Sequence, residues 1–137
     1  MLAASHPKAT VLVVEDDAIA RELLAHVLQT GGFEVITRST GEQALLVLCH
    51  QGAEIDWLVS KVSLPGLVCG WILKDEYNEH HPDRPVLLIS PLAPADAPAV
   101  HAVFVPPGAP MRILDLLQAL KNPEQAQVLQ FPAIQAA

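Results

Sequence analysis

The chain has 137 residues and a mass of 14.7 kDa, which fits one domain of ordinary size and leaves no room for a separate catalytic domain. Apolar residue types make up 51% of the chain and the mean hydropathy is +0.33, so a sizeable core can form and overall disorder is excluded. Fifteen acidic residues against eight basic ones give a net charge of −7, which disfavours direct contact with nucleic acid or anionic membranes.

Neither a membrane span nor a metal site is expected. No apolar run approaches the ~20 residues that a spanning helix needs, and Met1–Pro7 lacks the features of a secretory signal, so a cytoplasmic protein is predicted. Cys49 and Cys69 are too few for a disulfide framework or a thiolate metal site and are predicted to be core residues. The adjacent His80 and His81 point about 100° apart on a helix and cannot easily share one ion.

Strands and helices alternate through the first half of the chain. Short runs of β-branched residues and leucine indicate buried strands, and apolar residues spaced by three and four indicate helices. Gly31-Gly32 and Gly52 are typical helix stops. The predicted elements are a strand at Val11–Val14, a helix at Ala18–Thr30, a strand at Phe33–Thr37, and a helix from the capping residues Ser39 and Thr40 to about Gln51.

The second half continues the alternation but has one gap. Pro91, Pro94 and Pro98 occupy the segment where a fourth helix would fall, and proline breaks helices, so a loop or at most one turn is predicted there. The other predicted elements are a strand at Ile55–Val62, a loop at Ser63–Gly66, a helix at about Cys69–His81, strands at Pro85–Ser90 and Val100–Val105, and a helix at Pro110–Lys121.

This alternation predicts an α/β fold, a doubly wound five-stranded parallel sheet of flavodoxin-like type with helices on both faces. Residues 1–121 form the predicted domain, and residues 122–137 form a tail that is a linker, an arm packed on its own domain, or a segment that docks on a partner. In such sheets ligands bind outside the carboxyl ends of the strands. Five residues fall at these ends and predict one pocket: Glu15, Asp16, Lys61, Ser90 and Pro106. The alternative interpretation, for each residue taken alone, is a solvent-exposed residue at the end of a strand.

Several segments together resemble the receiver domain of two-component response regulators. They are Val11–Asp17, Asp56–Gly70 with its Leu64-Pro65-Gly66, and Val86–Ser90, and the match covers about Lys8–Lys121. The resemblance implies the strand order 2-1-3-4-5. It also implies a pocket in which an acidic pair holds Mg²⁺ and an aspartate at the end of the third strand accepts a phosphoryl group from a histidine kinase. A hydroxyl after the fourth strand and a lysine after the fifth then contact that group.

Two of these positions depart from the family. Glu15 and Asp16 match the acidic pair and Ser90 matches the hydroxyl, but Lys61 stands where the resemblance puts the phosphoacceptor, and Pro106 stands in place of the lysine. Phosphoryl transfer needs a carboxylate nucleophile and a metal that offsets its charge, and an ammonium supplies neither. We therefore expect no catalytic activity and lost or weak Mg²⁺ binding, with vestigial Glu15 and Asp16 and no other cofactor.

Lys61 has two interpretations. In the favoured one its ammonium reaches Glu15 and Asp16 and substitutes for the lost metal; at ~4 Å and an effective dielectric of ~20 one such contact is worth about 4 kcal/mol before desolvation. In the other, Lys61 extends into solvent from a decayed site while its stem covers apolar surface.

The signalling face of the family is also altered. Only sixteen positions separate Ser90 from Pro106, and the aromatic position of the family falls on Val103. Helix four of the family is therefore predicted to be shortened or replaced by the proline-rich loop. A possible interaction surface comprises Val100, Val103, Phe104 and Phe131, although the strand residues could equally be core residues of an edge strand.

The predicted function is that of an atypical receiver that is not an enzyme and works as a phosphorylation-independent protein-interaction module. Its partner would be a histidine kinase, an output protein or a second copy of the chain, with no nucleic acid or membrane involved. One alternative is phosphorylation at a non-standard residue such as Asp56, Ser60 or Ser63. Another is that the chain is the regulatory domain of a larger signalling protein, against which its length and its Met1 start argue mildly.

Overall fold

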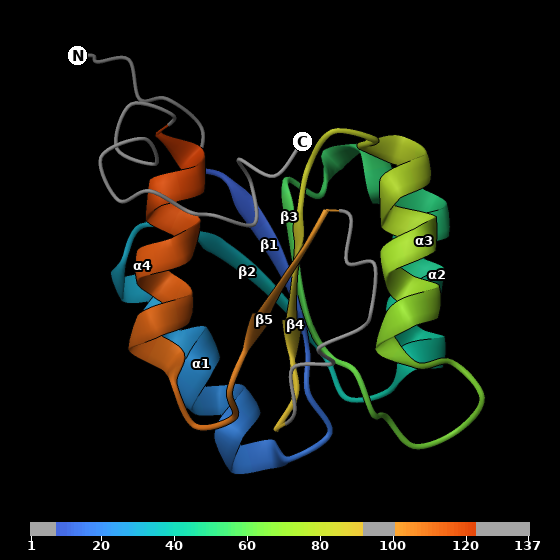
Figure 1. The fold of residues 1–137 in the computed structure, drawn as a ribbon, viewed down its shortest axis with the longest axis horizontal. Coiled ribbons are helices and arrows are strands. Elements are labelled where there is room, and N and C mark those ends of the chain that lie inside the picture. The colour runs from blue at the N-terminus through green and yellow to red at the C-terminus, as the bar shows by residue number, and fades with distance from the viewer. Residues whose placement is uncertain (1–7, 92–100, 123–137) are drawn as a thin grey trace.

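Five short apolar segments form one parallel sheet in the computed structural model, which describes residues 8–91 and 101–122 (Figure 1). The strand order is β2-β1-β3-β4-β5, and every neighbouring pair is parallel, which confirms the predicted fold class and order. In chain order the elements are β1 (Thr10–Val14), α1 (Ala18–Thr30), β2 (Glu34–Arg38), α2 (Gly41–Gln51), the 3₁₀ turn η1 (Gly52–Glu54), β3 (Trp57–Lys61), α3 (Gly70–His80), β4 (Val86–Ile89), β5 (Ala102–Val105) and α4 (Pro110–Lys121).

The sheet has a helical layer on each face. Helices α1 and α4 cover one face, and α2 and α3 cover the other (Figure 1). Side chains of β1 alternate between the layers: Val11 and Val13 join the α1–α4 core, and Leu12 and Val14 join the α2–α3 core. Because β1 and β3 are buried on both faces, Val11–Val14 and Trp57–Val59 are continuous apolar runs.

The helices begin where the local sequence provides a cap. The Asp17 carboxylate accepts a hydrogen bond of 2.8 Å from the amide of Ala20 at the start of α1. The Thr40 hydroxyl accepts one of 3.1 Å from the amide of Gln43 at the start of α2. Both caps satisfy amides that the first turn of a helix leaves without an internal partner.

Some predicted boundaries are wrong by one or two residues. Strand β3 begins at Trp57 rather than at Ile55, because the amide of Ile55 donates to the Gly52 carbonyl (3.2 Å) and closes η1. Strand β5 begins at Ala102 because His101 has a φ of +62°, a left-handed conformation that interrupts extended backbone. The terminal residues of strands and helices are the least regular, so shifts of this size in the boundaries are expected.

The predicted burial of the cysteines was also wrong. Cys49 is exposed on the outer side of α2, and Cys69 is only partly buried where it precedes α3. Burial on a helix depends on its rotation by 100° per residue, so Cys49 lies beside the buried Leu48 in sequence but on the other side of the helix.

Part of the prediction lies outside the described residues. This holds for the proline-rich segment at 92–100, where the sequence predicts a shortened or missing helix four, and for the tail at 123–137, which includes Phe131. In the part of the chain that is described, no helix has the length and apolar character needed to cross a bilayer.

Candidate functional site

The register of the sheet brings four strand ends to one edge. Val14 lies opposite Ser60, so the residues that follow β1 lie beside the last residue of β3. Lys61 lies opposite Ile89, and Ile89 opposite Val105, which aligns the ends of β4 and β5 with them. This edge lies at the bottom of Figure 1 and carries all five predicted site residues, namely Glu15, Asp16, Lys61, Ser90 and Pro106.

Lys61 bridges the two acidic residues. Its Nζ lies 2.9 Å from Asp16 Oδ1, which is a hydrogen-bonded ion pair, and 3.7 Å from Glu15 Oε2. The side chains of Lys61 and Asp16 are 30% and 37% exposed, whereas that of Glu15 is only 9% exposed. The ammonium therefore closes over a buried carboxylate while it binds an exposed one.

Backbone contacts hold the acidic loop in place. The amide of Glu15 donates to the carbonyl of Arg38 at 3.1 Å, and Glu15 Oε2 accepts from the amide of Asp17 at 2.9 Å. From the first turns of α1, the Arg21 guanidinium donates to the Glu15 carbonyl at 2.9 Å and lies 3.5 Å from that of Asp16. The backbone of the loop and the carboxylate of Glu15 are thus held by contacts other than the one with Lys61.

The three charges shift one another's pKa. Burial raises the pKa of Glu15, against the opposing effects of the Asp17 amide and Lys61. The hydrogen bond from Lys61 lowers the pKa of Asp16, and the same bond raises the pKa of Lys61. At neutral pH the Lys61–Asp16 pair is therefore fully charged.

The Asp16 contact is expected to disappear in acid. The folded protein holds the pKa of Asp16 below its ordinary value of 3.8, so near that pH the unfolded chain binds more protons and stability falls as the pH falls. The difference in free energy of unfolding between wild type and Asp16→Asn, at most about 1 kcal/mol for so exposed a pair, should be constant above about pH 5 and shrink as the pH falls through the lowered pKa of Asp16. Urea unfolding across this range measures the difference, and a difference that grows as the pH falls would contradict the pair.

The ends of β4 and β5 supply a hydroxyl and a proline. The amide of Ser90 donates to the Val105 carbonyl at 3.0 Å, which places Ser90 directly beyond the paired strands. Pro106 is exposed and opens the turn that reaches Gly108, whose φ is +77°. The cation at this edge is therefore Lys61, the last residue of β3. The residue that follows β5, Pro106, carries no charge.

A third acidic residue, Glu42 on α2, fixes the loop that follows Lys61. Its carboxylate accepts from the amide of Leu67 at 2.8 Å, and this contact lowers the pKa of Glu42. Gly66, with a φ of +90°, lets the carboxylate approach, since a Cβ there would lie 2.5 Å from Glu42 Oε2. The loop presents Leu67, whose side chain is 90% exposed, beside the site.

The sequence analysis did not identify three residues that shape this site, namely Asp17, Arg21 and Glu42. Asp17 carries a signal that was available, because an aspartate just before an apolar periodic segment is a typical helix cap. Arg21 and Glu42 carry none, since their partners depend on how a helix packs on a loop.

The predicted interaction surface is described only in part. Phe104 packs edge-on against Trp71, with 5.8 Å between ring centroids, on the α2–α3 side of the sheet. Val103 packs against the core on the opposite side. Both are partly buried, as the core interpretation requires, and Val100 and Phe131 lie outside the described residues.

Two of the three alternative phosphoacceptors, Asp56 and Ser60, are poorly placed, whereas Ser63 is exposed just beyond β3. Asp56 precedes β3 at the opposite edge of the sheet, where its carboxylate accepts from the amide of Thr10 at 2.7 Å and lies 3.5 Å from Arg84. Ser60 is fully buried, and its hydroxyl donates to the Lys61 carbonyl at 2.8 Å.

Comparisons with known proteins agree on one family. Residues 11–105 match the response regulator receiver domain. The chain is 36% identical over 95 residues to the response regulator protein FleR of Pseudomonas aeruginosa, covering 69% of this chain and 19% of that protein, and 34% identical over 97 residues to the sensor kinase CckA of Brucella abortus, covering 65% and 10%. A response regulator receiver protein from Sinorhizobium medicae has the same fold, with a TM-score of 0.73 at 24% identity over 84% of this chain and 95% of that one. The chain thus spans about a fifth or less of these two curated relatives.

Proposed function

The chain belongs to the response regulator receiver family of two-component signalling, and from that premise we propose that it is an atypical receiver that accepts no phosphoryl group and acts by protein contact alone. It would serve as an interaction module for a histidine kinase, an output protein or another receiver-like chain. The relatives are much longer than this chain, so the activities of the whole proteins are not carried over to it.

One observation carries the proposal: the last residue of β3 is Lys61, whose ammonium lies 2.9 Å from Asp16. The family resemblance puts the phosphoacceptor carboxylate at this position. An ammonium has no lone pair with which to attack phosphorus, and the raised pKa of Lys61 keeps it protonated at neutral pH. Among the described residues, Glu15 and Asp16 are the carboxylates that form ion pairs with Lys61.

The residues present do not fit Mg²⁺. This ion requires near-octahedral oxygen ligands at about 2.0–2.1 Å and is usually bound through carboxylates. Here one oxygen of Asp16 already binds an ammonium, and one of Glu15 accepts from the amide of Asp17. The described residues hold no group of three or more histidine, cysteine, aspartate or glutamate side chains arranged for a metal. Lys61 would occupy the place of the cation itself.

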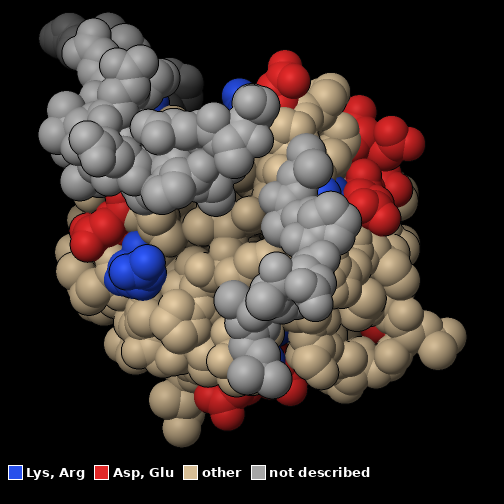
Figure 2. All heavy atoms as spheres, in the orientation of Figure 1, with Lys and Arg blue, Asp and Glu red and all other residues tan. Residues whose placement is uncertain are grey.

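In this proposal the ion pair has a structural role. It ties the end of β3 to the loop after β1, so the edge keeps one conformation without a metal or a phosphoryl group. A partner would then recognise a constant surface, and regulation would come from the amount or location of the protein. The face of the molecule seen in Figure 2 is unsuited to nucleic acid, because acidic side chains gather over the upper part of α3, among them Asp75, Glu76 and Glu79.

Acetyl phosphate tests the proposal directly. Incubation of the purified chain with acetyl phosphate and Mg²⁺ is expected to leave its intact mass unchanged, because Lys61 holds the phosphoacceptor position and the neighbouring carboxylates already accept from the Asp17 amide and the Lys61 ammonium. A receiver that retains its aspartate, treated in parallel, shows that the reagent is active. Appearance of any phosphoryl adduct would overturn the proposal. A base-labile adduct would point to a carboxylate such as Asp56, a base-stable one to Ser60 or Ser63, and peptide mapping would locate it.

A further inference from the structure

Strand β2 has an outer edge that pairs with no other strand among the described residues. The amide of Glu34 donates to the carbonyl of Ala9, and the carbonyl of Arg38 accepts from Glu15, so both residues turn their backbone groups toward β1. In a parallel ladder, alternate residues of a strand face the same neighbour. The two residues of β2 that direct their amides and carbonyls away from β1 are therefore Val35 and Thr37.

The sequence of β2 is complementary to itself. It reads Glu-Val-Ile-Thr-Arg from Glu34 to Arg38. If two copies pair antiparallel with Ile36 at the centre, Val35 lies opposite Thr37 of the second copy, and their outward amides and carbonyls can exchange both hydrogen bonds. Each Glu34 then lies opposite an Arg38 in a pair without backbone hydrogen bonds, where opposite side chains are close together.

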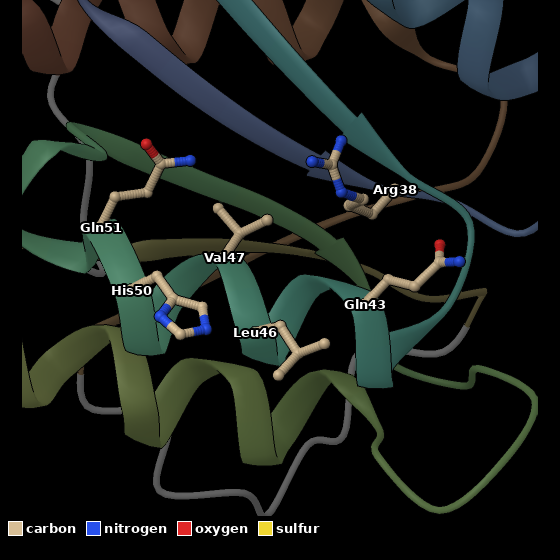
Figure 3. A pocket seen from close by; sticks show the side chains of 6 residues that line it. All are labelled: Arg38, Gln43, Leu46, Val47, His50 and Gln51. Atoms are coloured by element: carbon tan, nitrogen blue, oxygen red, sulfur yellow. The ribbon is translucent and has the colours of Figure 1, made fainter.

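The side of β2 that carries these charges faces an open groove against α2 (Figure 3). The groove has a volume of about 450 Å³ and is bordered by Arg38 on β2 and by Leu46, Val47 and His50 on α2. Its ionisable lining residues are Arg38 and His50, whereas the chain as a whole has a net charge of −7. The Leu46 side chain is 60% exposed. The groove thus suits an occupant that brings a carboxylate and covers an apolar side chain.

Charges at an exposed strand often prevent pairing, and Arg38 acts in that way in the single chain. Its guanidinium donates to the outward carbonyl of Thr37 at 2.6 Å. A carbonyl oxygen has two lone pairs, so this contact leaves one for a second chain. In a parallel pairing in register, Glu34 would meet Glu34. The charges therefore disfavour that arrangement and favour the antiparallel register centred on Ile36.

We propose that β2 is a self-association edge, which pairs antiparallel with β2 of a second copy and joins the two sheets into one around a two-fold axis at Ile36. Glu34 of each copy would bind Arg38 of the other beside the α2 groove. The inference names a partner for the interaction module proposed above but rests on the β2 edge alone. It could hold even if the chain accepts a phosphoryl group.

Charge reversal and mixing test the register. In sedimentation equilibrium at about 0.15 M salt, wild type is expected to dimerise, and Glu34→Arg or Arg38→Glu alone should raise the dimer Kd at least tenfold, equivalent to about 1.4 kcal/mol. An equimolar mixture of the two variants should recover dimers of near wild-type Kd, because both cross-strand pairs are then opposite in charge. Glu79→Arg makes the same charge change as Glu34→Arg, but on α3, and should leave the dimer Kd unchanged.

Three results would overturn the inference: a wild-type chain that stays monomeric up to about 1 mM, a dimer that neither charge reversal weakens, or a mixture of variants that stays as weak as each alone. Circular dichroism checks that each variant is folded. If one is not, the double variant E34R/R38E, which restores both pairs within one sequence, takes the place of the mixture. None of these readouts involves phosphorylation, so this proposal and the proposed function fail independently.

Discussion

Replacing Lys61 by aspartate is expected to create a Mg²⁺ site at the carboxyl edge of the sheet. The formal charge of Glu15, Asp16 and residue 61 would change from −1 to −3, and the ammonium bound to Asp16 would be gone. Without metal, mutual repulsion of the carboxylates should lower the free energy of unfolding by about 1–2 kcal/mol. Mg²⁺ at one hundred times its Kd should add about 2.7 kcal/mol to the variant. Urea unfolding with and without Mg²⁺ measures both effects, and wild type should show no dependence on Mg²⁺.

Lys61→Met is the matched control. It keeps an unbranched side chain at the end of β3 but removes the charge, so it separates the loss of the ammonium from the gain of a carboxylate. We expect its stability to respond to Mg²⁺ far less than that of Lys61→Asp. Failure of Lys61→Asp to respond to Mg²⁺ would mean that the pocket has collapsed. A Mg²⁺ response without phosphorylation by acetyl phosphate would instead identify Pro106 as a second lesion.

The fold and the place of the site follow from local signals that the sequence carries in full. Buried parallel strands must be apolar on both faces, so runs such as Val11–Val14 are visible without a structure. The parallel arrangement then brings all carboxyl ends to one edge, which is why residues as distant as Asp16 and Lys61 could be predicted to lie together.

The detailed contacts could not be predicted, because they depend on side-chain geometry. Charge counting treats Glu15 and Asp16 as equal partners of Lys61, but the structure separates them, with 3.7 Å to one and 2.9 Å to the other. The difference arises because Glu15 turns its carboxylate toward the amide of Asp17. The contact between Glu42 and Leu67 likewise joins residues 25 positions apart and has no local signal.

Gly70→Ala is expected to cause a large loss of stability, about 3 kcal/mol. Gly70 begins α3, and a Cβ on it would lie 2.3 Å from the Lys61 carbonyl oxygen and 2.9 Å from Val62 Cα, both of them backbone atoms. Its amide donates to the Val62 carbonyl at 2.9 Å, so the helix cannot move away without losing that bond. Helix propensity alone would favour alanine by up to about 1 kcal/mol, and the backbone clash exceeds this gain. Urea denaturation of the variant against wild type measures the outcome.

Gly31→Ala makes the same chemical change at a site where the obstacle can move. A Cβ there would lie 2.4 Å from Leu114 Cδ1, the tip of a flexible side chain, and Gly31 has a φ of −79° that alanine adopts without strain. We expect a loss of less than about 1 kcal/mol for this control. If both variants lost the same stability, the close approach of α3 to the backbone of Lys61 and Val62 would not be a rigid contact. If only Gly70→Ala is strongly destabilised, the backbone beneath the Lys61 ion pair is itself a rigid part of the site.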